Sequence, residues 1–134
     1  DKRIGMLWDT DQKNTICPPG TTVCEYEFDG VKQQSEDENS ILNYYKRCNM
    51  IRNAFPCIMR GETERIRYDS SDVLVLRKTW QDETIIIIIN FSQEDRSVNI
   101  GQKLQPAALL TVKGEIGIRN EEVSMPGYSI AVML

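Results

Sequence analysis

Acidic residues are the first candidates for chemistry in this 134-residue sequence. Two carboxyl groups held several ångströms apart on a rigid scaffold can cleave a glycosidic bond, one as the acid and the other as the nucleophile or base. The acidic residues here open a predicted helix at 36–38, fill a turn at 82–83 and precede a strand at 121–122, while Asp69 falls in a loop. These positions are typical of helix caps and solvated surfaces. The sequence therefore predicts no catalytic carboxylate pair in this segment.

Histidine is absent from the sequence. Its absence removes Ser-His-Asp and Cys-His nucleophiles and every metal site built on imidazole. The cysteines form no CxxC pair, so a zinc ribbon is not predicted, and no glycine-rich phosphate loop implies a cofactor. Cys17 and Cys24 could close a short disulfide loop, but free thiols, with Cys48 on the buried face of a helix, are the favoured interpretation. The four cysteines are Cys17, Cys24, Cys48 and Cys57.

Two motifs could bind or carry sugar. Asn90-Phe91-Ser92 matches the N-glycosylation sequon, but it follows directly on a hydrophobic strand, where a glycan would have poor access. Trp80 could form part of a stacking platform for glucose. No cluster of aromatic residues accompanies Trp80, so we expect this ring to be a packing residue.

The composition is that of an ordinary globular chain, with 40% hydrophobic residues, 27% charged residues and a net charge of -4. Lysine and arginine are scattered, so we expect neither a nucleic acid nor a membrane as a partner. No apolar run reaches the roughly 18 residues that span a bilayer. The sequence begins without Met in the middle of a motif, so we expect any targeting signal to lie upstream.

The first elements that must position these residues are a loop and a helix. Residues 1 to about 34 are predicted to be irregular, with Pro18-Pro19-Gly20 typical of a loop. A helix is predicted over about 37–55, with Asp37 as its N-cap and an end before Pro56. Apolar residues recur along one face of this helix at Ile41, Tyr45, Cys48, Ile51 and Phe55.

The second half is predicted to be an all-β antiparallel sandwich. Gln81-Asp82-Glu83 should join two strands as a hairpin, and Lys113-Gly114 should form another tight turn. Ile85 to Ile89 is an uninterrupted β-branched run, which indicates a strand covered on both faces. A sandwich of this size can cover one face, so we expect a neighbouring domain on the other. The predicted strands are 63–68, 72–80, 84–91, 97–100, 107–112, 115–119 and 129–134.

Three segments together resemble the closing part of the alpha-amylase family of glycoside hydrolases, family thirteen. Arg3-Ile4-Gly5-Met6-Leu7-Trp8-Asp9 resembles an Arg-x-Pro-Met-x-Trp-Asp motif after the last barrel strand, with Gly5 in place of Pro. Asp37 to Arg47, continuing to Arg60-Gly61, is similar to the last barrel helix. The final segment, which looks like the C-terminal Greek-key sandwich, comprises Val73–Trp80, Ile85–Ser92 and Pro126–Leu134.

The resemblance implies an α+β fragment, with residues 1–60 ending a catalytic β/α barrel and residues 61–134 forming the sandwich. The parent would be a secreted or cell-surface retaining hydrolase of α-linked glucans such as starch, with its catalytic Asp, Glu and second Asp all before Asp1. Calcium, common in such enzymes, would be bound by loops outside this segment. Arg3 would lie near the glucan cleft, and a structural salt bridge is an equal alternative for it.

Three hypotheses follow for the segment itself. The leading one is a structural role, in which the barrel of the same parent chain is the partner. The second is a sandwich that binds starch through an exposed aromatic such as Trp80. The third is a non-catalytic relative that keeps the fold as an interaction scaffold.

Overall fold

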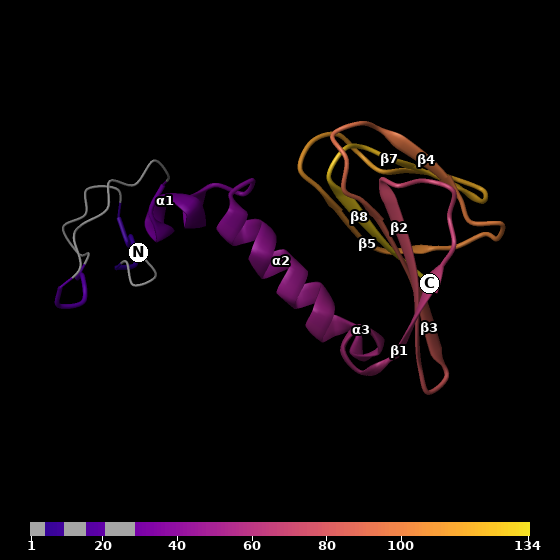
Figure 1. Ribbon diagram of the computed structural model, residues 1–134, viewed down its shortest axis with the longest axis horizontal. Helices are drawn as coiled ribbons and strands as arrows, with labels where there is room; N and C mark the ends of the chain where they lie inside the picture. Colours follow the sequence, from indigo (N-terminus) through magenta and orange to yellow (C-terminus); the bar gives the residue numbers. More distant parts are fainter. Residues whose placement is uncertain (1–4, 10–15, 21–28) are drawn as a thin grey trace. The chain divides into compact units, whose positions relative to one another are not determined.

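A computed structural model describes residues 5–9, 16–20 and 29–134 (Figure 1). The chain divides into two units, Asp1–Met50 and Ile51–Leu134. The expected boundary between a barrel part and a sandwich at residue 60 stays a prediction. Among the described residues, no helix has the length and apolar character needed to cross a membrane.

The first unit contains the helix α1 (Val31–Glu36) and the start of α2 (Ile41–Ala54). The irregular segment predicted to reach about residue 34 is therefore interrupted by α1. Asp37 is not the N-cap of the longer helix, because it is the C-terminal cap of α1, where its N–H donates to the Gln33 carbonyl. Ser40 caps α2 instead, since its hydroxyl oxygen accepts the Asn43 N–H at 3.1 Å.

Two of the five residues of the apolar stripe predicted along the helix are exposed, and the other three are half-buried. Ile41 is 84% exposed and Tyr45 is 68% exposed, and no described residue of α2 is buried. Cys48 is half-buried, as are Tyr44 and Ile51 on the same side of α2, so the prediction of a buried face is met only in part. Proteins rarely leave such a stripe uncovered, because a helix in water gains most of its stability from packing that face.

The second unit is an antiparallel β-sandwich, as predicted. Its five-stranded sheet has the order β1-β2-β3-β8-β5 and its three-stranded sheet the order β4-β7-β6. The described strands are β1 (Glu62–Ile66), β2 (Val73–Trp80), β3 (Glu83–Asn90), β4 (Arg96–Asn99), β5 (Pro106–Thr111), β6 (Gly117–Arg119), β7 (Glu122–Met125) and β8 (Ser129–Met133).

The turns explain how two sheets arise from one run of strands. Gln81, at φ 53°, forms the β2–β3 hairpin with Asp82, as predicted. Lys113-Gly114, predicted as a tight turn, connects β5 of one sheet to β6 of the other, with Gly114 at φ 74°. The strand β7 was not predicted, since only a short polar link separates it from β6 and Asn120 makes that turn at φ 55°.

The core lies between the two sheets. Ile86 and Ile88 of β3 point into it, as do Val98 of β4 and Met125 of β7. All four are 2% exposed or less. This closely packed layer holds the sheets face to face, and its apolar burial is the main source of the unit's stability.

The other face of β3 is covered by the chain's own helix α3 (Pro56–Arg60). Ile85 is fully buried there with Cys57 of α3 and Val132 of β8. Gly61 lets α3 end so close to the sheet, because a Cβ at this position would lie 2.9 Å from the Thr79 carbonyl oxygen of β2. Ile87 and Ile89 remain half-buried. The prediction of cover on both faces is confirmed at Ile85, although the cover comes from this chain.

An ion pair also joins the two sheets at one end. Arg96, the first residue of β4, donates from Nε and Nη2 to one carboxylate oxygen of Asp72, at 3.1 and 2.5 Å. Asp72 directly precedes β2 of the other sheet. The Arg96 hydrogen bond holds the pKa of the Asp72 carboxyl below its ordinary value of 3.8.

We expect this ion pair to stabilise the fold only where Asp72 is ionised. Because its folded-state pKa is lowered, the contribution is complete above the ordinary value and is lost as the pH falls through the lowered value. Asp72→Asn should therefore reduce the free energy of unfolding at about pH 6, and its effect should diminish as the pH falls below the ordinary value of 3.8. Urea unfolding of Asp72→Asn, Arg96→Gln and the double variant measures the coupling. Additive effects of the two substitutions at pH 6 would contradict the pair.

Candidate functional site

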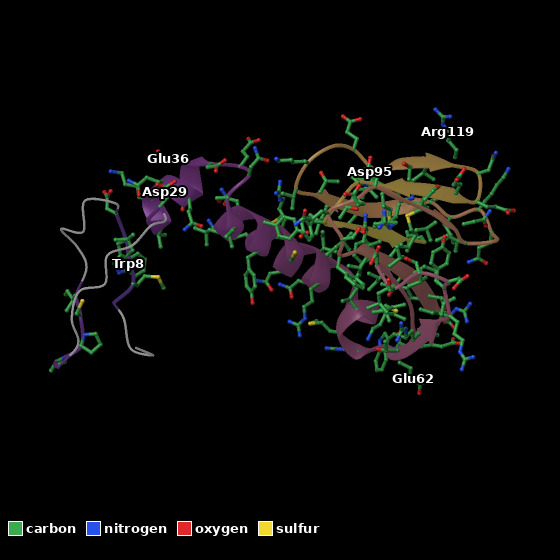
Figure 2. All side chains as sticks on the ribbon, turned by 45° about the horizontal axis from the view of Figure 1, so that its top comes forward. Trp8, Asp29, Glu36, Glu62, Asp95 and Arg119 are labelled. Carbon is green, nitrogen blue, oxygen red and sulfur yellow. The ribbon has the colours of Figure 1, made fainter. Side chains whose placement is uncertain are left out.

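The carboxylates of Asp9, Glu64 and Asp72 each form an ion pair with a different basic residue. Besides the Asp72 pair, Glu64 accepts from Arg77 at 2.8 Å across β1 and β2. Figure 2 shows Glu62 and Asp95 at opposite ends of the second unit. Within the described ranges, no group of three or more Cys, Asp or Glu side chains could hold a metal ion. The described carboxylates thus offer charge and hydrogen bonds at the surface.

The thiols are candidates for a nucleophile. Burial raises the pKa of both the Cys48 and the Cys57 thiol. Cys57 is fully buried and donates from Sγ to the Lys78 carbonyl at 3.1 Å, while Glu83 raises its pKa further. A reactive thiol needs a lowered pKa and access, so these two are structural. Cys17 is also a free thiol, and Cys24 lies outside the described residues.

Arg3, the predicted substrate contact, lies outside the described residues. The part of its motif that the structure describes is bound to α1. The Val31 N–H donates to the Leu7 carbonyl at 2.9 Å, and the Lys32 N–H donates to the Trp8 carbonyl at 3.0 Å. Leu7 is buried beneath this contact, whereas the Trp8 ring is 53% exposed. The segment is therefore fixed by its backbone, and it displays Trp8.

Asp9 binds the end of the motif, residues 5–9, to α1 through side-chain hydrogen bonds. Its carboxylate accepts from Gln33 Nε2 at 2.7 Å and from Lys32 Nζ at 3.1 Å. Gly30 permits the approach, because a Cβ there would lie within 2.9–3.0 Å of the Asp9 backbone. Sequence reasoning missed this contact, since Asp9 and its partners are separated by 23 and 24 residues without a shared motif.

Trp80, the candidate stacking residue, has the packing role predicted for it. Its ring is half-buried against the cluster of Ile85, Cys57 and Val132. A platform for sugar needs a ring whose face is open to the ligand. The packing of Trp80 therefore gives no support to starch binding at this residue.

Asn90 organises the other candidate region of the sandwich. It is 1% exposed, and its side-chain NH₂ group lies within hydrogen-bond distance of three backbone carbonyls, those of Glu94, Met125 and Pro126, at 2.8, 3.2 and 3.0 Å. Its Oδ1 accepts from both the N–H and the hydroxyl of Ser92. The nitrogen that a glycan would modify is thus enclosed, in agreement with the prediction of poor access.

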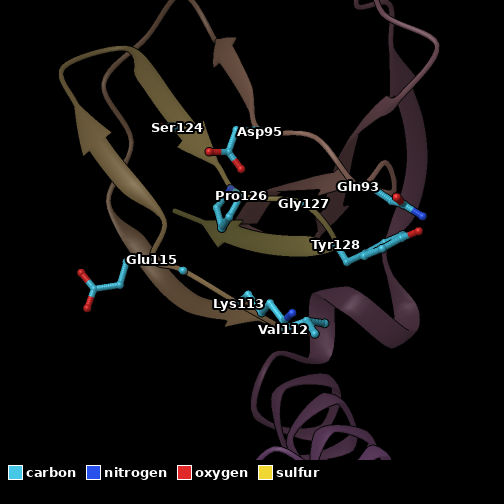
Figure 3. Close-up of a pocket in the computed structure, with 10 residues that line it drawn as sticks. Gln93, Asp95, Val112, Lys113, Glu115, Ser124, Pro126, Gly127 and Tyr128 are labelled. Carbon is cyan, nitrogen blue, oxygen red and sulfur yellow. The ribbon is translucent and has the colours of Figure 1, made fainter.

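A shallow groove of about 590 Å³ lies beside this network (Figure 3). Tyr128, at its side, is 47% exposed and adopts φ 53°. Asp95 points toward Pro126, while Glu115 points away from the other labelled side chains. The described residues that line the groove are Gln93, Asp95, Val112, Lys113, Gly114, Glu115, Ser124, Pro126, Gly127 and Tyr128.

Sequence reasoning treated Asn90 only as a sequon, although a stronger signal was present. Ile86, Ile88 and Asn90 share one face of β3, because side chains alternate along a strand. A polar residue at a core register position must find hydrogen-bond partners. The alternation of side chains along β3 therefore predicts that Asn90 faces the core. Its partners 35 and 36 residues away could not be predicted from the neighbouring sequence.

We expect Asn90→Asp to unfold or severely weaken the sandwich, by about 3 kcal/mol or more, because a carboxylate would face three carbonyl oxygens in place of an NH₂ donor. Asn99→Asp is the matched control. Asn99 is exposed and only accepts, from the Gly101 N–H at 2.8 Å, so this change should cost less than about 0.5 kcal/mol. Chemical denaturation of both variants tests the expectation, and equal losses would contradict it.

Several known proteins are similar to this chain in sequence or in structure. No family model matches the chain. Alpha-amylase 3 of Dictyoglomus thermophilum is 23% identical over 101 residues, which cover 75% of this chain and 20% of that protein. Oligo-1,6-glucosidase of Parageobacillus thermoglucosidasius is 31% identical over 96 residues, which cover 69% of this chain and 17% of that protein. The chain thus spans about a fifth of the length of these relatives.

A solved structure and a further relative extend the comparison. The structure of Eubacterium rectale Amy13B matches 98% of this chain with a TM-score of 0.90 and 28% identity, over 27% of its own length. The amino acid transporter heavy chain SLC3A2 of Oryctolagus cuniculus is 25% identical over 103 residues, which cover 76% of this chain and 20% of that protein. The same fold thus occurs within longer proteins with different names.

Proposed function

Since this chain belongs to the alpha-amylase family of glycoside hydrolases and corresponds to a C-terminal part of such an enzyme, we propose that it is a structural part of a longer α-glucan hydrolase. Residues 1–60 would supply the last loop and helix of the catalytic barrel, and residues 61–134 a sandwich packed on it. The barrel would carry the retaining chemistry on substrates such as starch.

The observation that carries this proposal is an apolar band on the outer face of the five-stranded sheet. The alternate residues Val73 and Val75 of β2 face the core, so Leu74 and Leu76 face outward. Leu74 lies opposite Ile89, and Ile89 lies opposite Ile130 of β8. All of these outward side chains are only half-buried.

A half-buried band of this kind favours a partner. Each leucine or isoleucine gains on the order of 1 kcal/mol when its exposed half is removed from water. Helix α3 covers only the end of the band around Ile85. A barrel surface in the same longer protein would cover the rest at little entropic cost, because the two parts are joined in one chain.

The charges of the described residues support a structural role for this part. An acid catalyst in glycoside hydrolysis needs a carboxyl group with a raised pKa, held within about 5–10 Å of a second carboxylate. Arg96 instead lowers the pKa of Asp72. We therefore assign the catalytic carboxylates to the barrel strands of the longer protein.

Arg3 is proposed as the contact of residues 1–60 with glucan in the catalytic cleft. The same motif is held against α1 through Leu7, Trp8 and Asp9. A loop fixed in this way can hold an arginine at a cleft, where its planar guanidinium would donate to sugar hydroxyls. The alternative is a structural salt bridge from Arg3.

We expect the purified chain to release no reducing sugar from soluble starch or maltoheptaose, because positioning of two carboxylates is indispensable to the reaction. A complete alpha-amylase assayed in parallel is the positive control. Release above the blank that grows in proportion to the amount of chain, in a preparation free of other proteins, would contradict the structural role.

The packing on a barrel predicts a context-dependent effect of Ile89→Ser. In the isolated chain Ile89 is already half in water, whereas in the longer protein the barrel should cover it. The loss in free energy of unfolding should therefore be larger in the longer protein by about 1–2 kcal/mol. Val112→Ser is the matched control, because Val112 is 55% exposed and lies outside the band. Equal effects of Ile89→Ser in both contexts would count against barrel packing.

A second candidate function is a non-catalytic scaffold with the same fold. It is favoured by the similarity to a protein named as an amino acid transporter heavy chain. A scaffold barrel would also cover the apolar band, so the band is compatible with both candidates. The two differ in whether the barrel strands of the longer protein carry the Asp, Glu and Asp carboxylates.

A further inference from the structure

We propose that the groove beside Tyr128 is a binding site for a neutral oligosaccharide. The existence of the site rests on the geometry of the groove alone. The identity of the sugar, an α-linked glucan, rests on the proposed function. This site lies on the sandwich and is separate from Trp80, the residue singled out by its sequence.

The Tyr128 ring is displayed to solvent by a constrained backbone. A positive φ is unfavourable for a residue with a Cβ, and it persists only where the surroundings enforce it. The Tyr128 N–H donates to the Ser92 carbonyl at 3.0 Å. Gly127 packs so closely that a Cβ there would lie 2.3 Å from the Gln93 carbonyl oxygen. The ring therefore has a fixed base although it is 47% exposed.

The buried Asn90 amide holds both sides of the groove together. It donates to the Glu94 carbonyl on one side and the Pro126 carbonyl on the other. The Ser129 hydroxyl also donates to the Pro126 carbonyl, at 2.6 Å. The site is thus organised before a ligand arrives, which reduces the ordering cost of binding.

The chemistry of the lining fits a sugar. A pyranose presents a C–H face that stacks on an aromatic ring, and hydroxyl groups that both donate and accept hydrogen bonds. Around Tyr128, the Gln93 amide can donate and accept, the Asp95 carboxylate accepts and the Lys113 ammonium donates. Lys113 is the one cation among the described lining residues, beside the carboxylates of Asp95 and Glu115, so the groove has no excess positive charge to bind a polyanion. The volume of about 590 Å³ is that of a site for a small ligand.

The test is a titration of the purified chain with maltoheptaose, followed by backbone amide NMR. We expect saturable shifts at Gly114, Ser124 and Gly127, which line the groove, and none around Trp80. The informative variant is Tyr128→Gly, because glycine adopts positive φ without strain and so removes the ring while preserving the turn. It should weaken binding roughly tenfold or more.

Two further variants control for the ring and for the fold. Tyr128→Phe should retain most of the affinity, because it keeps the stacking surface. Tyr45→Ala should leave the affinity unchanged, since Tyr45 is a still more exposed tyrosine, 68% exposed, in the other unit. Unchanged thermal unfolding of Tyr128→Gly would show that the lost affinity reflects the ring.

The outcomes separate this site from the proposed function. Absence of shifts with maltoheptaose and with cellohexaose, or full affinity in Tyr128→Gly, would overturn the site while leaving the structural role intact. Binding of cellohexaose alone at the groove would support the site and contradict the α-glucan assignment. Binding of maltoheptaose that is lost in Tyr128→Gly supports both.

Discussion

The burial of β3 on both faces is the constraint on which the rest of the sandwich depends. This strand is the middle of the five-stranded sheet, and its inward isoleucines meet the three-stranded sheet. Its outward Ile85 requires a second cover, which α3 supplies through Cys57. The position of α3, the glycine that ends it and the half-buried packing of Trp80 all follow from this one requirement. Beyond α3, the same strand leaves Ile87 and Ile89 half-buried on its outer face.

The two ends of β3 have different consequences. At the start of β3 the outward side chain of Ile85 is apolar and packs against α3. At its end the inward register passes from isoleucine to Asn90, and a single buried amide replaces apolar packing. That amide joins the chain after β3 to the chain before β8, so an interior residue determines the shape of a surface groove. Fold stability and the geometry of the groove are therefore coupled through one side chain.

The sequence predicted most of the second half, because its signals are local. The isoleucine run, the Gln81-Asp82 turn and the alternation of strands each act over a few residues. The failures have physical reasons. Asp37 has the chemistry of an N-cap, but Ser40 holds that position because α1 ends at Asp37. The short β7 was missed, since Glu122 and Ser124 on its exposed face look like loop residues.

The candidate sites were harder to predict than the fold. The contacts of Asp9 join segments more than 20 residues apart, and those of Asn90 join segments more than 30 apart, so no local pattern announces them. Tyr128 resembles any turn residue until its positive φ and exposure are known. The resemblance of three segments to one family supplied what local physics could not, since it placed them in a common longer architecture.

The enclosed amide of Asn90 also bears on how this protein can be produced. In the folded sandwich the Asn90 nitrogen is enclosed by backbone carbonyls and closed to a glycosylating enzyme. On a nascent chain the same sequon is accessible. A eukaryotic secretory pathway could attach a glycan to Asn90 before the sandwich closes. The glycan would then occupy the place where three carbonyls need a donor, and the two sheets could not pack together. Expression in a bacterial host avoids this competition between modification and folding.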